Sequence, residues 1–267
     1  MANSLGNKVA TGAIWASIEK FSMMALQFIV NLILARLLLP SDFGAIGMLA
    51  IFISVSQVLI DGGFASALIQ KKLPTQTDYS TIFYWNVTFS SFLYLILFLF
   101  APIIAKFFNM PVLSDVLRGI GLSLIINAAF SIQRVRLQKA LAFKILAITN
   151  VSAYVLGSSL GIIMAYYDFG VWSLVVMQVS YGLIAVLILA LITHWHPSLC
   201  FSKQSMKELF GFGGYIMAAS ILQEICKNIQ GLIIGKRFSS IQMGYYSQAY
   251  KLDQVTCNSI PQVIVQV

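Results

Sequence analysis

The stretch LARLLLPSDFG, residues 34–44, joins two long apolar segments and decides how the chain around it is interpreted. It follows an apolar run that contains Asn31, and it carries one cation, Arg36, before three leucines and Pro40. Proline cannot sit in a helix interior without breaking it, but it is favoured in the first turn of a new helix. The stretch therefore predicts the end of one helix, a tight turn and the start of a second helix.

The whole chain is as apolar as the segments beside this turn. Of its 267 residues, 59% are hydrophobic and only 10% are charged, and the mean hydropathy is +0.85. A soluble domain carries about 25% charged residues, so the solvent of this chain must be the lipid bilayer. The net charge of +8 is attributed to loop cations beside anionic lipid, and no nucleic-acid partner is expected. The predicted fold is all-α, a polytopic membrane helical bundle.

Membrane-spanning helices need about 20 apolar residues, and seven segments come close to that length or exceed it. These segments are Thr11–Ala35, Phe43–Ile60, Ile82–Ile104, Gly119–Gln133, Ile145–Tyr167, Phe169–Thr193 and Leu209–Gly235. An eighth span is expected to begin near Tyr246 and to be incomplete. We therefore expect the first part of a longer transporter, with a six-helix N-terminal lobe at residues 1–200 and the start of a C-terminal lobe at residues 201–267.

The distribution of basic residues predicts the orientation of these spans. With the N-terminus cytoplasmic, nine loop lysines and arginines face the cytoplasm and five face the opposite side, as the positive-inside rule requires. The nine are Lys8, Lys71, Lys72, Arg134, Arg136, Lys139, Lys144, Lys203 and Lys207. The five are Arg36, Lys106, Arg118, Lys236 and Arg237.

The opening stretch has a second copy 200 residues further on. LILARLLLPSDFG at 32–44 aligns with LIIGKRFSSIQMG at 232–244, where three residues are identical and Arg36 falls on Lys236. Six spans separate the copies, so both cross the membrane in the same direction. This pattern predicts a parallel repeat with its axis along the membrane normal, and substrate sites in such transporters lie between the repeats.

Several longer stretches, in this order and spacing, resemble one known family. They are GAIWAS (12–17), LARLLLPSDFG (34–44), DGGFASALIQKK (61–72), APIIAKFFNMPVL (101–113), LQKALAFK (137–144), YDFGVWSLV (167–175) and IGKRFSSIQMGYYSQA (234–249). The chain resembles the polysaccharide flippases of the multidrug/oligosaccharidyl-lipid/polysaccharide (MOP) exporter superfamily. Within that superfamily it looks most like the exporters of lipopolysaccharide, colanic acid and teichuronic acid.

This resemblance implies a transporter rather than an enzyme. Family members export a polyprenyl-pyrophosphate-linked glycan across the bacterial inner membrane by alternating access, for the synthesis of cell-surface polysaccharide. Two six-helix lobes form a V around a central cavity, and other polysaccharide-assembly proteins are further expected partners. Two alternatives remain open: a MATE-like cation-coupled drug antiporter, which would need cavity carboxylates, and a glycan polymerase or ligase. The latter needs catalytic acids, bases or metal ligands and a large external loop, which the sequence does not offer.

Charged and amide side chains within the spans are the candidate substrate-binding residues. An ionisable side chain at a helix centre costs roughly 2.5–3.5 kcal/mol and tends to face a cavity or a partner. Lys20, Gln27 and Asn31 fall on one helical face. In the second repeat, Lys227 aligns with Gln27, and Glu224 lies three residues before it. We expect these five residues to line a cavity that binds pyrophosphate. The alternative is that the lysines snorkel or form structural ion pairs with Glu19 and Glu224.

Three further charged residues are candidates for the rim of the cavity or for ion coupling. Arg36 is interpreted mainly as an anchor of the turn at the membrane surface, with a rim role as the alternative. Glu19 points about 100° away from Lys20, and Asp61 is interpreted first as a helix-end residue. Coupling to H⁺ or Na⁺ is left open, with Glu19, Asp61 and Glu224 as the protonation candidates.

No cofactor and no metal site is expected. The HWHP stretch, 194–197, has no third ligand nearby, and its tryptophan is expected in an interfacial aromatic belt.

Overall fold

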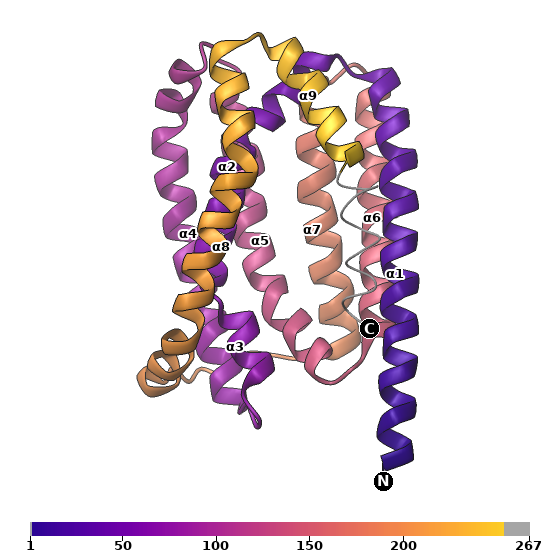
Figure 1. Cartoon of the computed structure of the whole chain (residues 1–267), viewed down its shortest axis with the longest axis vertical. Helices are drawn as coiled ribbons and strands as arrows, with labels where there is room; N and C mark the ends of the chain where they lie inside the picture. The colour runs from indigo at the N-terminus through magenta and orange to yellow at the C-terminus, as the bar shows by residue number, and fades with distance from the viewer. Residues whose placement is uncertain (1, 254–267) are drawn as a thin grey trace.

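The computed structural model describes residues 2–253, and this part of the chain folds into helices joined by short connections (Figure 1). The helices are α1 (Ala2–Leu37), α2 (Pro40–Asp61), α3 (Phe64–Gln70), α4 (Gln76–Phe107), α5 (Leu113–Lys139), α6 (Phe143–Tyr166), α7 (Val171–Thr193), α8 (Lys203–Arg237) and α9 (Ser240–Asp253). Helix α1 packs on α6, α6 on α7, α7 on α5, and α5 on both α4 and α2. The all-α prediction is confirmed for the described residues.

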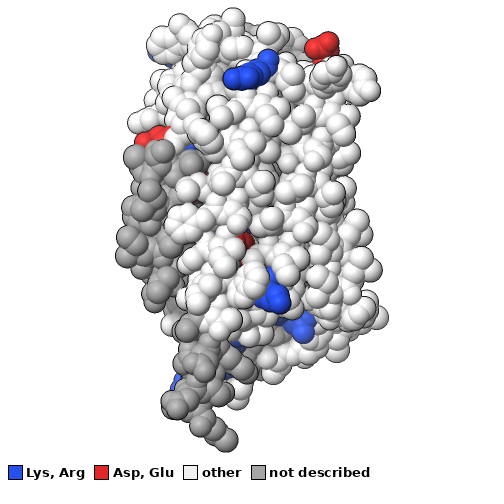
Figure 2. Space-filling model, turned by 90° about the vertical axis from the view of Figure 1, so that its right-hand side faces the viewer, with Lys and Arg blue, Asp and Glu red and all other residues white. Residues whose placement is uncertain are grey.

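Seven stretches of helix in the described part of the chain are long and apolar enough to cross a membrane. Each contains most or all of one predicted span, and one of them, Pro40–Gln70, joins α2 to α3. The shortest predicted run, Gly119–Gln133, belongs to the longer helix α5, which includes Asp115 and Arg118 near its start. Figure 2 shows that much of the face on the α1 side carries no charged side chain, as a lipid-facing surface requires. The polytopic membrane bundle is therefore confirmed.

The turn after α1 forms as the sequence predicts. Helix α1 ends at Leu37, and Pro40 begins α2. The carboxylate of Asp42 accepts a hydrogen bond from the Leu39 N–H at 3.0 Å, which satisfies a backbone donor that the new helix leaves unpaired. Arg36 is exposed in the last turn of α1, where a cation also opposes the negative end of the helix dipole.

The break between α2 and α3 depends on two adjacent glycines. Gly62 and Gly63 have φ values of 55° and 72°, in the left-handed region that favours glycine. The ammonium of Lys139 donates to the carbonyls of Leu68 and Ile69, at 3.1 and 2.7 Å, where α3 ends. A cation from α5 thus satisfies carbonyls that have no partner within the short helix.

The two copies of the repeat meet directly. Figure 1 shows the turn between α1 and α2 and the turn between α8 and α9 at the same end of the molecule, and α9 packs along α2. A Cβ on Gly44 would lie 2.0 Å from the Ser240 carbonyl oxygen, and a Cβ on Gly244 would lie 1.8 Å from that of Pro40. These reciprocal contacts are what a two-fold relation between the repeats produces.

Helix α9 begins at Ser240, the counterpart of Pro40, so the helix that contains the expected start of the eighth span begins before Tyr246. The continuation of that span after Asp253 lies outside the described residues. The division into a lobe at 1–200 and the start of a second at 201–267 stays a prediction, as does the orientation in the membrane. Lys71 and Lys139, from the group predicted to be cytoplasmic, meet beside α3, whereas Lys236, from the other group, contacts the end of α4 at the opposite end of the molecule (Figure 1).

Candidate functional site

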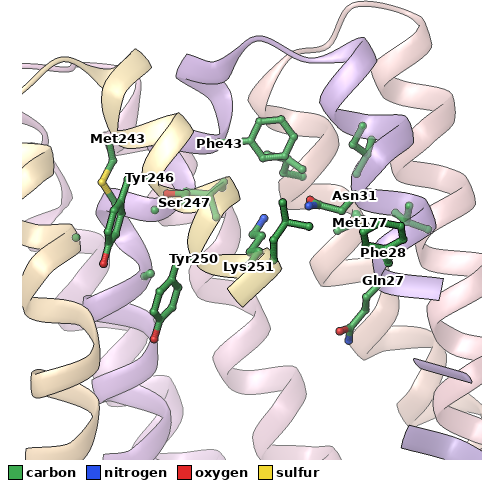
Figure 3. Close-up of a pocket in the computed structure, with 18 of the residues that line it drawn as sticks. Gln27, Phe28, Asn31, Phe43, Met177, Met243, Tyr246, Ser247, Tyr250 and Lys251 are labelled. Atoms are coloured by element: carbon green, nitrogen blue, oxygen red, sulfur yellow. The ribbon is translucent and has the colours of Figure 1, made fainter. Parts of the chain in front are cut away.

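A cavity of about 500 Å³ lies between the two copies of the repeat (Figure 3). Its walls come from α1 and α2 on one side and from α8 and α9 on the other, with one residue from α6 and two from α7. The polar side chains among its lining are Gln27, Asn31, Tyr154, Lys227, Asn228, Tyr246, Ser247, Tyr250 and Lys251. Apolar side chains such as Phe28, Phe43 and Met177 fill the space between them. The cavity combines apolar walls with a few polar groups, as small-molecule sites usually do.

Three of the predicted substrate-binding residues line this cavity. Gln27 and Asn31 reach it from α1, and Lys227 reaches it from α8. The Asn31 side-chain amide donates to the side-chain Oε1 of Gln248 at 2.8 Å, and this hydrogen bond joins α1 directly to α9. The C-terminal part of the polar stripe predicted on α1, at Gln27 and Asn31, thus faces the other repeat.

Lys227 also forms the ion pair that the sequence left as an alternative. Its ammonium lies 3.1 Å from the Glu224 carboxylate, one turn earlier on α8. The other carboxylate oxygen of Glu224 accepts from the Asn228 amide at 3.2 Å, and this amide also donates to the Ser54 hydroxyl on α2 at 3.2 Å. Glu224 is not among the cavity-lining residues, but both of these partners on α8, Lys227 and Asn228, are.

The other predicted site residues lie outside the cavity lining. Lys20 is half-buried on α1, closer to the N-terminus than the cavity. The Glu19 carboxylate accepts from the Asn150 amide of α6 at 2.5 Å, which agrees with its expected contact to a neighbouring helix. Asp61 is half-buried in the last position of α2, beside the glycine break, and Arg36 is exposed at the turn. The substrate-binding role of Lys20 and the rim or coupling roles of Glu19, Asp61 and Arg36 stay predictions.

Lys251 lines the cavity and was missed as a candidate. Its side chain projects from α9 into the cavity, where the ammonium lies 5.2 Å from the centroid of the Phe43 ring. An eighth span that begins near Tyr246 has Lys251 close to its start. A start at Ser240, read from the repeat, would have put Lys251 about 16 Å along the helix. The alignment of the two repeats could therefore have predicted that Lys251 lies well inside this helix.

The charge of the cavity lining is positive. Within the described part of the chain, Lys227 and Lys251 line the cavity, while no aspartate or glutamate does. Lys227 is partly neutralised by its pair with Glu224. Low-dielectric walls focus the field of the remaining charge and concentrate anions at such a site.

The histidine stretch begins at the C-terminal end of α7. The described residues hold no group of three histidine, cysteine or acidic side chains close enough to bind a metal ion. Trp195 is buried rather than part of an interfacial belt, so that expectation is wrong. Its ring packs against Phe83 with centroids 5.8 Å apart, and its indole N–H donates to the Gln76 side chain at 2.9 Å.

The family model described as polysaccharide biosynthesis protein matches residues 33–267. The chain is 25% identical over 272 residues to the teichuronic acid biosynthesis protein TuaB of Bacillus subtilis, covering 99% of this chain and 55% of that protein. It is 23% identical to the lipopolysaccharide biosynthesis protein WzxC of Escherichia coli K12 (99% and 54% covered). It is also 24% identical to the succinoglycan biosynthesis transport protein ExoT of Rhizobium meliloti (90% and 49% covered). The chain spans about half the length of these relatives, and no solved structure matches it.

Proposed function

Since the chain belongs to the polysaccharide biosynthesis protein family, we propose that it acts as a polysaccharide exporter, or as the corresponding part of one. Its substrate is a polyprenyl-pyrophosphate-linked oligosaccharide or polysaccharide, which is moved across the bacterial inner membrane for the synthesis of surface polysaccharide. The similarity to TuaB, WzxC and ExoT supports this proposal. The seven membrane-spanning stretches supply the multi-pass architecture that it needs.

The observation that carries the proposal is the charge of the cavity. A pyrophosphate-linked glycan presents two phosphate groups and a polar saccharide, and it needs a polar, cationic space inside the membrane. Lys227 and Lys251 line such a space together with Gln27 and Asn31. Lysine is a common phosphate ligand because its ammonium acts as a compact, positive hydrogen-bond donor. We assign these four side chains to substrate binding.

The same observation argues against a MATE-like antiporter for cationic drugs. A cationic substrate would need a carboxylate in the lining, and the described residues contribute none. The nearest carboxylate on α8, that of Glu224, is already paired with Lys227 at 3.1 Å. The cavity thus favours an anionic substrate.

Alternating access, a cytoplasmic N-terminus and interaction with other polysaccharide-assembly proteins complete the proposal. Sites between two repeats that rock about a central axis are the usual arrangement in such transporters. A coupling ion, H⁺ or Na⁺, would be bound by carboxylates within the helices, for which Glu19, Asp61 and Glu224 are the available groups. Lys20 remains a proposed second cation for the substrate path.

The test replaces the cavity lysines in cells that depend on this protein for surface polysaccharide. Lys227→Gln and Lys251→Gln should each reduce surface polysaccharide several-fold, and the double variant should abolish it at unchanged protein level in the membrane. Lys20→Ala is measured in parallel, and Lys203→Gln, exposed at the start of α8, serves as the control. Normal export by the double variant would refute the assignment of the cavity.

A further inference from the structure

The two partners of the ion pair on α8 are held very differently. One oxygen of the Glu224 carboxylate lies 3.1 Å from the Lys227 ammonium, and the other accepts from the Asn228 amide at 3.2 Å. The same amide donates to the Ser54 hydroxyl at 3.2 Å, so the carboxylate is also connected to α2. Within the described residues, the Lys227 ammonium has no ion pair or hydrogen bond besides this one. Movement of the lysine therefore breaks a single contact, and the carboxylate stays in place.

The position of the pair lets an anion in the cavity reach the lysine. Lys227 lines the cavity and is 42% exposed, whereas Glu224 lies outside the lining and is 22% exposed. The flexible four-carbon stem of a lysine allows its ammonium to turn while the helix stays fixed. Ion pairs three residues apart on one helix are also weak. An anionic ligand can therefore compete with Glu224 for Lys227.

No other cation takes the place of Lys227 beside Glu224. Lys227 is the only lysine or arginine in the middle of α8, and α2 carries none along its length. Lys251 of α9, the other cavity lysine, lies against the ring of Phe43 instead. When Lys227 turns to an anion, Glu224 is thus left as a negative charge close to that anion. Like charges a few ångströms apart repel strongly where water is scarce.

We propose that Glu224 is an internal counter-ion that competes with the anionic substrate for Lys227 and limits how tightly the cavity holds it. Before substrate binds, Glu224 neutralises Lys227. The pyrophosphate then takes over the ammonium, and Glu224 regains it when the substrate leaves. Glu224 is a positioning residue in this account, because it acts through Lys227 and does not touch the substrate. The inference rests on the proposed function and deepens it.

A limited affinity suits a transporter. A pyrophosphate bound by two lysines with no opposing charge would leave a low-dielectric cavity slowly, whereas a transport path needs binding that is weak enough for release. A purely structural ion pair makes the opposite prediction for the loss of Glu224. It would leave Lys227 and Asn228 less well placed and so weaken binding of the anion. A counter-ion, by contrast, predicts tighter binding once its charge is removed.

The experiment measures binding of inorganic pyrophosphate, by calorimetry, to the purified full chain in phosphatidylcholine nanodiscs. Glu224→Gln keeps an acceptor for the Asn228 amide and should tighten binding by about five-fold or more. In a Lys227→Gln background, the same change should alter the affinity by less than about two-fold, because no pair remains to be broken. Glu208→Gln is the matched control. It removes the same charge from α8, but Glu208 is 54% exposed and lies 3.5 Å from Lys71, so the affinity should not change.

The outcomes separate this inference from the proposed function. Glu224→Met, which removes the charge and the acceptor together, should show the same gain as Glu224→Gln. If neither variant binds pyrophosphate more tightly, or if the gain is equally large without Lys227, the counter-ion role is wrong while the exporter proposal stands. If instead the unmodified chain does not bind pyrophosphate, or if replacing both cavity lysines changes neither binding nor export, the proposed function itself fails.

Discussion

The α8–α9 pair contacts the preceding helices through different kinds of interaction at its two ends. At the end that carries the α1–α2 turn, α9 meets α2 through backbone contact at Gly44 and Gly244. At the other end, α8 meets α3 and α4, and charged and hydroxyl side chains hold the contact together with a second pair of glycines. The cavity lies between these two contacts, so its access depends on both.

The glycine contact resembles the close crossings of small residues in membrane helix pairs. Such crossings gain from van der Waals packing, because lipid provides no hydrophobic driving force between helices. At offset 200, Gly44 corresponds to Gly244 and Gly47 to Ser247, and a Cβ on Gly47 would lie 2.1 Å from the Ser247 hydroxyl. The two repeats therefore supply the same small-residue face to one shared contact.

The polar contact is built around Lys71, which lies between α3 and α4. Its ammonium lies 3.0 Å from the buried Asp78 carboxylate and 3.5 Å from Glu208 of α8. Burial lowers the pKa of Lys71, but the hydrogen bond and charge of Asp78 and the charge of Glu208 outweigh it and raise this pKa above its usual value. Lys71 is therefore fully charged at neutral pH and can hold both acids.

Because the two contacts are built differently, separating each of them breaks different interactions. Parting two glycine faces exposes backbone already bonded within its own helix, so no hydrogen bond is lost. Parting the polar contact frees charges that water or ions must solvate, so its strength depends on salt. The glycine contact should thus be sensitive to added atoms and the polar contact to charge and ionic strength.

The largest expected effect comes from adding one methyl group at the glycine contact. Gly44→Ala would place its Cβ 2.0 Å from the Ser240 carbonyl oxygen, and backbone cannot yield as a flexible side chain does. Overpacking typically costs about 1–3 kcal/mol, and we expect a loss at or above this range, measured as thermal unfolding in detergent micelles. Gly244→Ala should match it, because its Cβ would lie 1.8 Å from the Pro40 carbonyl oxygen.

The control for this pair is Gly211→Ala on α8, where an added Cβ meets nothing within 4 Å. In a helix interior that change should be neutral or stabilise by about 0.5–1 kcal/mol. If Gly44→Ala were as harmless as Gly211→Ala, the backbone crossing of the repeats would be wrong.

The second effect concerns the glycines at the polar end. Gly213→Ala on α8 would bring its Cβ to 2.7 Å from the Gly62 carbonyl oxygen. This approach is less severe than at Gly44, so we expect a loss of about 1–3 kcal/mol in the same unfolding measurement. Gly214→Ala, whose nearest neighbour would be a Phe210 ring carbon at 3.8 Å, is the adjacent control. Equal melting temperatures for the two variants would argue against close packing here.

These glycines show how far the sequence could predict the fold. The seven spans and the turn at Pro40 follow from apolar length and proline chemistry, which act locally. The alignment of Gly44 with Gly244 predicts their equivalence, and the structure adds that they touch. The approach of Gly63 to Gly213 joins residues 150 apart, and nothing local to either glycine signals it.

The candidate site was predictable to a similar degree. Helical periodicity placed Gln27 and Asn31 on one face, and the repeat placed Lys227 opposite them. Neither could say at which depth the cavity lies, so Lys20 was included and Lys251 was left out. Depth depends on how the two repeats pack, which is a tertiary property.

The third effect, smaller again, tests the charge at the centre of the polar contact. Asp78→Asn keeps the side-chain volume but removes the charge that accepts from Lys71 and from the Thr75 N–H, at 3.0 and 2.8 Å. Because this side chain is only 1% exposed, we expect a loss of about 1–2 kcal/mol. Asp168→Asn is the control, since Asp168 is exposed and its left-handed backbone suits asparagine. Similar melting temperatures for the two variants would show that Asp78 contributes little.

The smallest effect separates the two contacts most clearly. Glu208 is 54% exposed and lies 3.5 Å from Lys71, so Glu208→Gln should cost only about 0.2–1 kcal/mol, as exposed ion pairs do. This cost should disappear as ionic strength rises from about 0.01 to 1 M, because the Debye length falls from roughly 30 to 3 Å. The Gly44→Ala cost should stay constant over the same series, since packing is not screened. A salt-independent cost for Glu208→Gln, or a salt-dependent one for Gly44→Ala, would mean that the two ends are not held by different forces.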